Sequence, residues 1–261
     1  MKVLCEEMRM LGLIKIEWLR LVSELKNYKL NQIVGIFDVI LLCAGILIGT
    51  GKDLFPDGNQ MYALIGMILW RSTTVCLQTC CEIVQKELRL GTMEQLMLAH
   101  YSFLKVMIAR LITIVLVEGG KLALATVVRS VMFRIEFHGE PSLILTSAVI
   151  LVSLFGAFGM GFVVAGMALV YKKANALVNS VSYFMLFFTG ALIPLEVLPS
   201  GFLPIAKLFP FIWAVKSIQR NQISESFILL MISSLAWFIF GVGAFMLFNE
   251  RAQARGTVGK Y

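Results

Sequence analysis

Charged residues are scarce in this sequence: Asp, Glu, Lys and Arg together make up 15% of its 261 residues. An average soluble domain carries about 25%. The shortage argues against an ordinary soluble enzyme, and apolar residues take the place of the missing charges, at 59% of the chain. These apolar residues come in long blocks rather than in periodic stripes, which is typical of membrane-spanning segments.

Cysteine and histidine are also sparse, with five and two residues respectively. No cysteine pair has the CxxC spacing, so we interpret the cysteines as small buried apolar residues and expect no structural disulfide. His100 and His138 fall on opposite membrane faces in the topology given below, so they cannot share a metal ion. No metal and no cofactor are expected in this chain.

Catalytic and nucleotide-binding motifs are missing. Neither HExxH nor GxSxG occurs. The nearest approach to a phosphate-binding loop is GTGKD at Gly49–Asp53, which has Asp53 where Ser or Thr should bind magnesium, and Ile46 where a glycine is required. The chain itself is therefore not expected to be an enzyme, and ATP and Mg would have to be bound by a separate subunit.

A secretory signal peptide is not expected either, because residues 1–31 alternate charged and apolar side chains without a continuous apolar stretch. Residues 8–30 instead form an amphipathic helix. Its apolar side carries Leu11, Ile14, Trp18, Leu21, Val22 and Leu25. This pattern fits a helix in the cytoplasmic membrane interface, with Trp18 at headgroup depth, and equally a helix packed on another domain.

Six apolar blocks follow, each near or above the ~20 residues that cross a bilayer. They lie at residues 32–50, 61–84, 104–128, 143–170, 176–195 and 227–248. Because every backbone amide in hydrocarbon must bond within its own segment, we predict helices, and hence an all-α polytopic membrane protein with a single transmembrane domain over residues 1–261.

The net charge of +7 would suit a nucleic-acid partner in a soluble protein. Here Lys and Arg lie mostly between the apolar blocks, where membrane orientation and lipid contact explain them, and no nucleic acid is expected. Placing both termini in the cytoplasm puts most of these residues inside. The sequence thus predicts a multi-pass protein of the inner, or plasma, membrane.

Two connections between the blocks carry structure of their own. On the cytoplasmic side, within residues 87–100, Gly91 can end an extension of the second span. Thr92 and Gln95 can then start a short new helix. On the outer side, residues 194–220 combine four prolines with many aromatic residues, which predicts short helices that re-enter the outer leaflet.

These connections resemble a known family. The string GTMEQLMLAHYSFLKVMIAR at residues 91–110 looks like the cytoplasmic segment of ABC type-2 transporter permeases. The string FFTGALIPLEVLPSGFLPIAKLFPFIWAVKSIQ at residues 187–219 resembles their extracellular re-entrant segment. The resemblance extends to the amphipathic start, the six spans and the length.

The resemblance implies a permease subunit that pairs with a second permease, as a homodimer or heterodimer, and rests on cytosolic ATPase subunits. It places Gly91, Thr92, Glu94 and Gln95 in a coupling helix at the ATPase contact. It also places three residues of the outer segment at an outer gate: Pro194, Glu196 and Pro199.

Five charged residues fall inside the apolar blocks, at a cost of about 2.5–3.5 kcal/mol each if unpaired at the membrane centre. They are Asp38, Arg71, Arg110, Glu118 and Lys121. Matching depths suggest Arg71 with Glu118 and Asp38 with Arg110, whereas Lys121 could instead pair with Glu118. Structural links between helices and a polar lining for a substrate both remain open.

Phe184, Phe187 and Phe188 cluster before the outer segment, and either pack against neighbouring helices or guide an amphipathic cargo. Together these observations favour an ATP-driven exporter of a hydrophobic or amphipathic substrate such as a drug, peptide, lipid or glycolipid. A secondary transporter is the first alternative, although no internal repeat supports it. A membrane enzyme or scaffold is the second.

Overall fold

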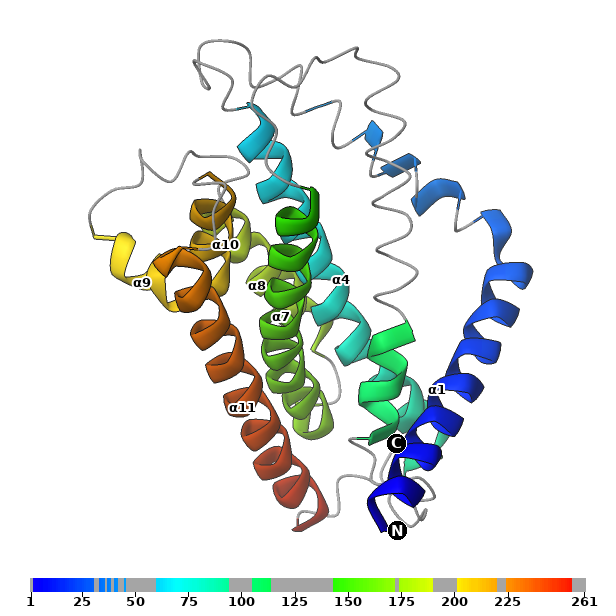
Figure 1. Cartoon of the computed structure of the whole chain (residues 1–261). Helices are drawn as coiled ribbons and strands as arrows, with labels where there is room; N and C mark the ends of the chain where they lie inside the picture. The colour runs from blue at the N-terminus through cyan, green and yellow to red at the C-terminus, as the bar shows by residue number, and fades with distance from the viewer. Residues whose placement is uncertain are drawn as a thin grey trace. The chain divides into compact units, whose positions relative to one another are not determined.

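The computed structural model in Figure 1 describes residues 2–30, 33–35, 37–38, 40–41, 45, 60–93, 105–113, 143–171, 174–189, 201–219 and 224–254. All regular structure within these ranges is helical, which confirms the predicted all-α class. The chain forms two compact units. The first holds α1 (Lys2–Asn27) and the helical residues 105–113. The second holds α4 (Gln60–Leu90) together with the helices that follow residue 137.

In the first unit, α1 spans Lys2–Asn27 and is amphipathic. Ile14 and Leu21 are half-buried, while Ile16 and Leu19 are exposed. Glu17 lies on the buried side of the helix and is only 8% exposed. The face that α1 buries is therefore built around a carboxylate as well as around apolar side chains.

The second unit is a helical bundle. Its elements are α4 (Gln60–Leu90), α7 (Leu143–Tyr171), α8 (Asn175–Phe188), α9 (Leu203–Leu208), α10 (Pro210–Gln219) and α11 (Glu225–Ala254). α7 packs between α4 and α11, and α8 packs on α4. The short helices α9 and α10 lie near the end of the bundle at which α11 begins, away from the end at which α4 and α7 finish (Figure 1).

α7 and α11 approach so closely that their backbones touch. A Cβ atom added at Gly159 would collide with the carbonyl group of Trp237, and one added at Gly241 would collide with the carbonyl group of Gly159. On the opposite side of α7, a Cβ atom at Gly161 would lie 2.5 Å from Cys80 Sγ of α4. Small residues of this kind are what allow helices to pack tightly where no hydrophobic force draws them together, as in a bilayer.

Two helices are long and apolar enough to cross a membrane, namely Leu145–Tyr171 and Glu225–Ala254, as judged over the described residues by length and composition alone. They correspond to the predicted spans 143–170 and 227–248. α11 continues beyond its predicted end at residue 248, through the mostly polar residues 249–254, which are still helical. α4 covers the predicted span 61–84 and also continues, to Leu90.

The remaining predicted spans are described only in part. α8 begins at Asn175, close to the predicted start, but it ends at Phe188 and not at residue 195. Thr189 closes it, with its backbone N–H donating to Met185 O at 3.2 Å and its hydroxyl to Leu186 O at 3.0 Å. Most of span 32–50 and residues 114–128 of span 104–128 lie outside the described residues.

Candidate functional site

The predicted end of the second span is present. α4 stops at Leu90, and Gly91 follows with φ of 68°, while its N–H donates to Leu88 O at 3.3 Å. This left-handed conformation favours glycine, which commonly ends helices in this way. Residues 87–90 thus belong to α4, which corrects the predicted lower bound of the coupling helix at residue 87.

Thr92, which the sequence analysis placed at the start of the coupling helix, follows Gly91 and is half-buried. Glu94 and Gln95, assigned to the same contact, lie outside the described residues. The structure therefore gives the point at which α4 ends and the chain turns. The helix predicted to follow stays a prediction.

Alanine at position 91 tests this helix end. A side chain in the left-handed region costs about 1–2 kcal/mol, so Gly91→Ala should lower the melting temperature in detergent. Nothing lies within 4 Å of the added Cβ atom at Gly91 or at Gly243 of α11. Gly243→Ala is thus the matched control, and it should be neutral or stabilising because alanine favours a helix interior. Equal melting temperatures for the two variants would contradict the assignment.

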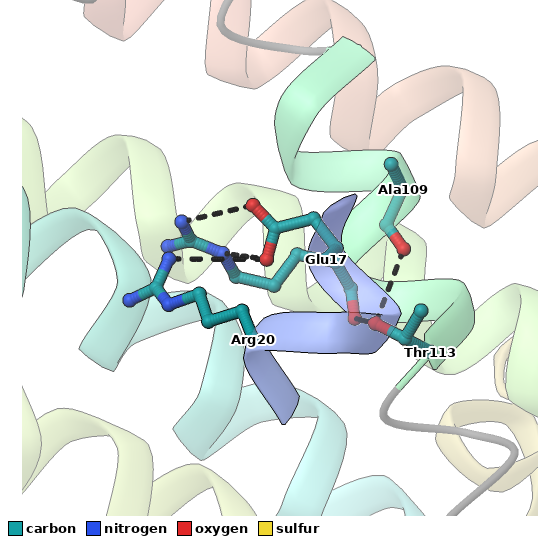
Figure 2. A network of polar contacts seen from close by, with 5 residues as sticks. Glu17, Arg20, Ala109 and Thr113 are labelled. Carbon is teal, nitrogen blue, oxygen red and sulfur yellow. Dashed lines mark hydrogen bonds and ion pairs between the residues drawn. The ribbon is translucent and has the colours of Figure 1, made fainter. Parts of the chain in front are cut away.

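The most fully described polar site is a buried ion pair in the first unit (Figure 2). Arg110 donates from Nε to Glu17 Oε2 at 3.0 Å and from Nη2 to Glu17 Oε1 at 3.2 Å. The two side chains are 11% and 10% exposed. A two-point contact of this kind orients both groups and is stronger than a neutral hydrogen bond.

The surroundings of the pair add further polar contacts. Arg20 Nη1 lies 3.8 Å from Glu17 Oε2, and its side chain is 34% exposed. Thr113, one turn beyond Arg110, donates its hydroxyl to Arg110 O at 2.7 Å and lies 3.3 Å from Ala109 O. The pair thus ties α1 to the helical residues 105–113.

This pair corrects the predicted partner of Arg110. Depth matching gave Asp38, but Asp38 is exposed, and the carboxylate that binds Arg110 comes from Glu17. Arg71 in α4 is half-buried, and its Nε atom is buried without a hydrogen-bond partner. Its predicted partner Glu118 lies outside the described residues, and so does Lys121.

The outer segment is a helical elbow formed by α9 and α10. Phe209 separates the two helices with an extended backbone, φ −94° and ψ 146°, as expected for a residue before a proline. Pro210 then opens α10. The two described prolines of this segment, Pro204 and Pro210, therefore lie at the starts of short helices. Pro194, Glu196 and Pro199, predicted to form the outer gate, lie outside the described residues.

Side chains of α10 and α11 complete the hydrogen bonding of this elbow. Leu208 O accepts from Trp237 Nε1 at 2.9 Å and from Ser233 Oγ at 3.2 Å. Lys207 O accepts from Trp213 Nε1 at 2.9 Å. The last carbonyl groups of a helix have no partner within the helix, so these donors supply hydrogen bonds to the carbonyl groups at the end of α9.

Aromatic rings connect the elbow to α8 and α11. Phe209 stacks on Trp237 of α11, with ring centroids 5.4 Å apart, and on Phe188 of α8 at 5.8 Å. Phe184 meets Phe188 edge-on at 4.8 Å. Phe188 is buried, whereas Phe184 and Phe187 are about half-exposed. Packing thus accounts for Phe188, and two rings remain available at the surface.

Metal chemistry finds no support in the described part of the chain, where no group of three or more His, Cys, Asp or Glu side chains is placed to hold an ion. The features that are present are a helix end, a buried ion pair, a helical elbow and tightly packed apolar helices. Long apolar helices that pack through small residues are typical of membrane-spanning proteins.

Comparison with known proteins agrees with this description. A search of curated proteins gives no significant match. A family model described as "ABC-2 type transporter" matches residues 10–223, which include most of α1, the buried ion pair, α4, α7, α8 and the elbow. On this match, which covers most of a chain built from apolar helices, the protein is a membrane transporter permease and belongs to the ABC-2 type transporter family.

Proposed function

We propose that this chain is the permease subunit of an ATP-driven exporter. It would move a hydrophobic or amphipathic substrate out of the cytoplasm or the inner leaflet. The observation that carries the proposal is the family match over residues 10–223. Since the sequence has no phosphate-binding loop, ATP is hydrolysed by a separate cytosolic subunit, and a second permease completes the complex.

A six-span arrangement with both termini in the cytoplasm is part of this proposal. The directions of the described helices support it: α4, α7 and α11 finish toward one end of their bundle, and α8 starts there (Figure 1). In the proposed orientation this end faces the cytoplasm. The α9–α10 elbow then lies on the outer side, where the closing element of an exporter is required.

The depth of the elbow can be measured with single cysteines. Phe209 is buried in the protein, whereas Phe202 is 51% exposed. If the elbow sits in the outer leaflet, lipid shields position 202, and both Phe202→Cys and Phe209→Cys should react slowly with a membrane-impermeant maleimide in intact cells. Glu225→Cys, at an exposed polar position at the start of α11, is the control and should label promptly. Prompt labelling at position 202 would contradict the outer-leaflet placement.

An amphipathic cargo is supported by the aromatic side chains near the elbow. Phe184 and Phe187 lie on α8, and their rings are exposed. Exposed aromatic rings can bind apolar groups without fixing their shape, which suits a transporter of varied hydrophobic compounds. The drug, peptide, lipid and glycolipid classes all meet this requirement.

Isolation of the tagged chain from its own membranes in mild detergent tests the proposed function. We expect a stoichiometric second subunit with a phosphate-binding loop, and ATP hydrolysis that rises when the transported compound is added. Glu94→Lys should preserve membrane insertion and abolish this stimulation, because a reversed charge at the subunit contact costs several kcal/mol. Transport driven by an ion gradient, with no nucleotide-binding subunit present, would overturn the proposal in favour of a secondary transporter.

A further inference from the structure

A half-open polar cleft of about 200 Å³ lies between α4 and α8. Its lining residues are Gln78, Cys81 and Glu82 of α4, and Asn175, Val178 and Asn179 of α8. One carboxylate and three carboxamides thus gather in a chain that is 59% apolar. Neither the coupling segment nor the outer elbow includes any of these residues.

The two walls of the cleft are held in place by their own contacts. The Cys81 thiol lies 3.7 Å from Asn175 Oδ1, and Gln85 donates from Nε2 to Cys81 Sγ at 3.3 Å. Further along, Trp70 Nε1 donates to Ser182 O at 2.7 Å, which fixes α8 against α4. The cleft is therefore a feature of a packed helix pair.

The polar groups of the cleft are accessible. Glu82, Asn175 and Asn179 are exposed, whereas Cys81 and Val178 are buried and form its base. An ionised carboxylate only accepts hydrogen bonds, and each carboxamide offers one further accepting oxygen. An ammonium group, with several N–H donors and a positive charge, matches this lining, while a phosphate or carboxylate would be repelled by Glu82.

The position of the cleft indicates what carries the ammonium group. The cleft is lined by residues from the first turns of α8. α8 begins at the end of the bundle that faces the cytoplasm in the orientation proposed above (Figure 1). The volume of the cleft admits a headgroup and not a whole amphiphile. Tyr183 of α8, one turn after Asn179, has an exposed aromatic side chain that an attached alkyl chain could follow.

We propose that the α4–α8 cleft binds the ammonium group of an amphiphile, carried either by a zwitterionic lipid headgroup or by a cationic amphiphilic solute. The cytoplasmic placement rests on the proposed function. The chemistry of the cleft does not depend on it.

Binding of spin-labelled phosphatidylethanolamine to the purified full-length chain, in nanodiscs of phosphatidylcholine, tests the proposal without any ATPase. Glu82→Gln should weaken binding about tenfold, because a charge-assisted hydrogen bond is lost. Asn179→Ala, a change at an exposed position, should weaken it less. Glu250→Gln, at an exposed carboxylate of α11 outside the cleft, should leave it unchanged.

Competitors separate the two sources of the ammonium group. Displacement of the labelled lipid by dodecylammonium would show that a cationic solute occupies the cleft, and displacement by phosphatidylethanolamine alone would show a lipid headgroup site. Equal displacement by phosphatidylglycerol, or unchanged binding in Glu82→Gln, would overturn the proposal. Because no ATPase takes part in this assay, its results would still hold if the exporter hypothesis were rejected.

Discussion

Gly159→Ala should lower the free energy of unfolding by about 3 kcal/mol, a large effect for one added methyl group. The new Cβ atom would meet the backbone of Trp237 and Phe238 in α11, and a backbone cannot rotate away as a side chain can. α7 and α11 would have to separate along their whole contact. Gly241→Ala should act in the same way, since its Cβ atom would meet the carbonyl group of Gly159.

A graded series of glycine variants makes this prediction sharper. At Gly156 the added Cβ atom would lie 3.0 Å from Pro210 Cγ and 3.1 Å from Ser234 Cα, so a small shift can relieve the contact. The melting temperatures in detergent should therefore fall in the order Gly243→Ala, Gly156→Ala and then Gly159→Ala. The close packing of α7 on α11 would be refuted if Gly159→Ala melted together with Gly243→Ala.

Removing the carboxylate of Glu17 should be the second large effect. Glu17→Ala leaves the Arg110 guanidinium buried without the group that neutralises it, which typically costs about 3–5 kcal/mol. The double change Glu17→Ala with Arg110→Ala should cost less than the sum of the single changes, because no charge is then stranded. Chemical unfolding in mixed micelles gives the three free energies.

Arg20 provides the control for this cycle. It lies 3.8 Å from the same carboxylate, but its side chain is 34% exposed. Solvent-exposed pairs contribute about 0–1 kcal/mol, so Arg20→Ala should change little. Additive losses for Glu17 and Arg110, or a loss at Arg20 as large as that at Glu17, would show that the two-point contact is not the stabilising one.

Arg110 illustrates how much of the buried ion pair could be predicted from the sequence. An arginine inside an apolar block requires a partner, and this requirement could be stated from the sequence. The identity of the partner could not, because depth matching searched only the apolar blocks. Glu17 belongs to an amphipathic helix, where a carboxylate is expected on the solvated face. Only tertiary packing, which turns Glu17 inward and leaves Trp18 exposed, reveals the pair.

Helix bounds show a related limit. Hydropathy marks where side chains prefer hydrocarbon, so it locates α7 closely, from Leu143 to Tyr171. It underestimates α4 and α11, because a helix continues through polar residues as long as its backbone hydrogen bonds continue. The sequence gives the positions of the glycines but not which of them contact another helix. Gly159 meets the backbone of α11, whereas a Cβ atom at Gly243 would have no neighbour within 4 Å.

The hydrogen bonds at the elbow have a consequence for biosynthesis. The carbonyl group of Leu208 accepts from Ser233 and Trp237, which lie 25 and 29 residues later in the chain. Leu208 is therefore synthesised before either of the residues that donate to it. In the proposed outer-leaflet placement an unpaired carbonyl is costly, so the elbow would reach this depth only after α11 has inserted. A released chain that is truncated before residue 233 should leave the elbow on the aqueous side of the membrane, because Trp237 is then absent and cannot cover Phe209.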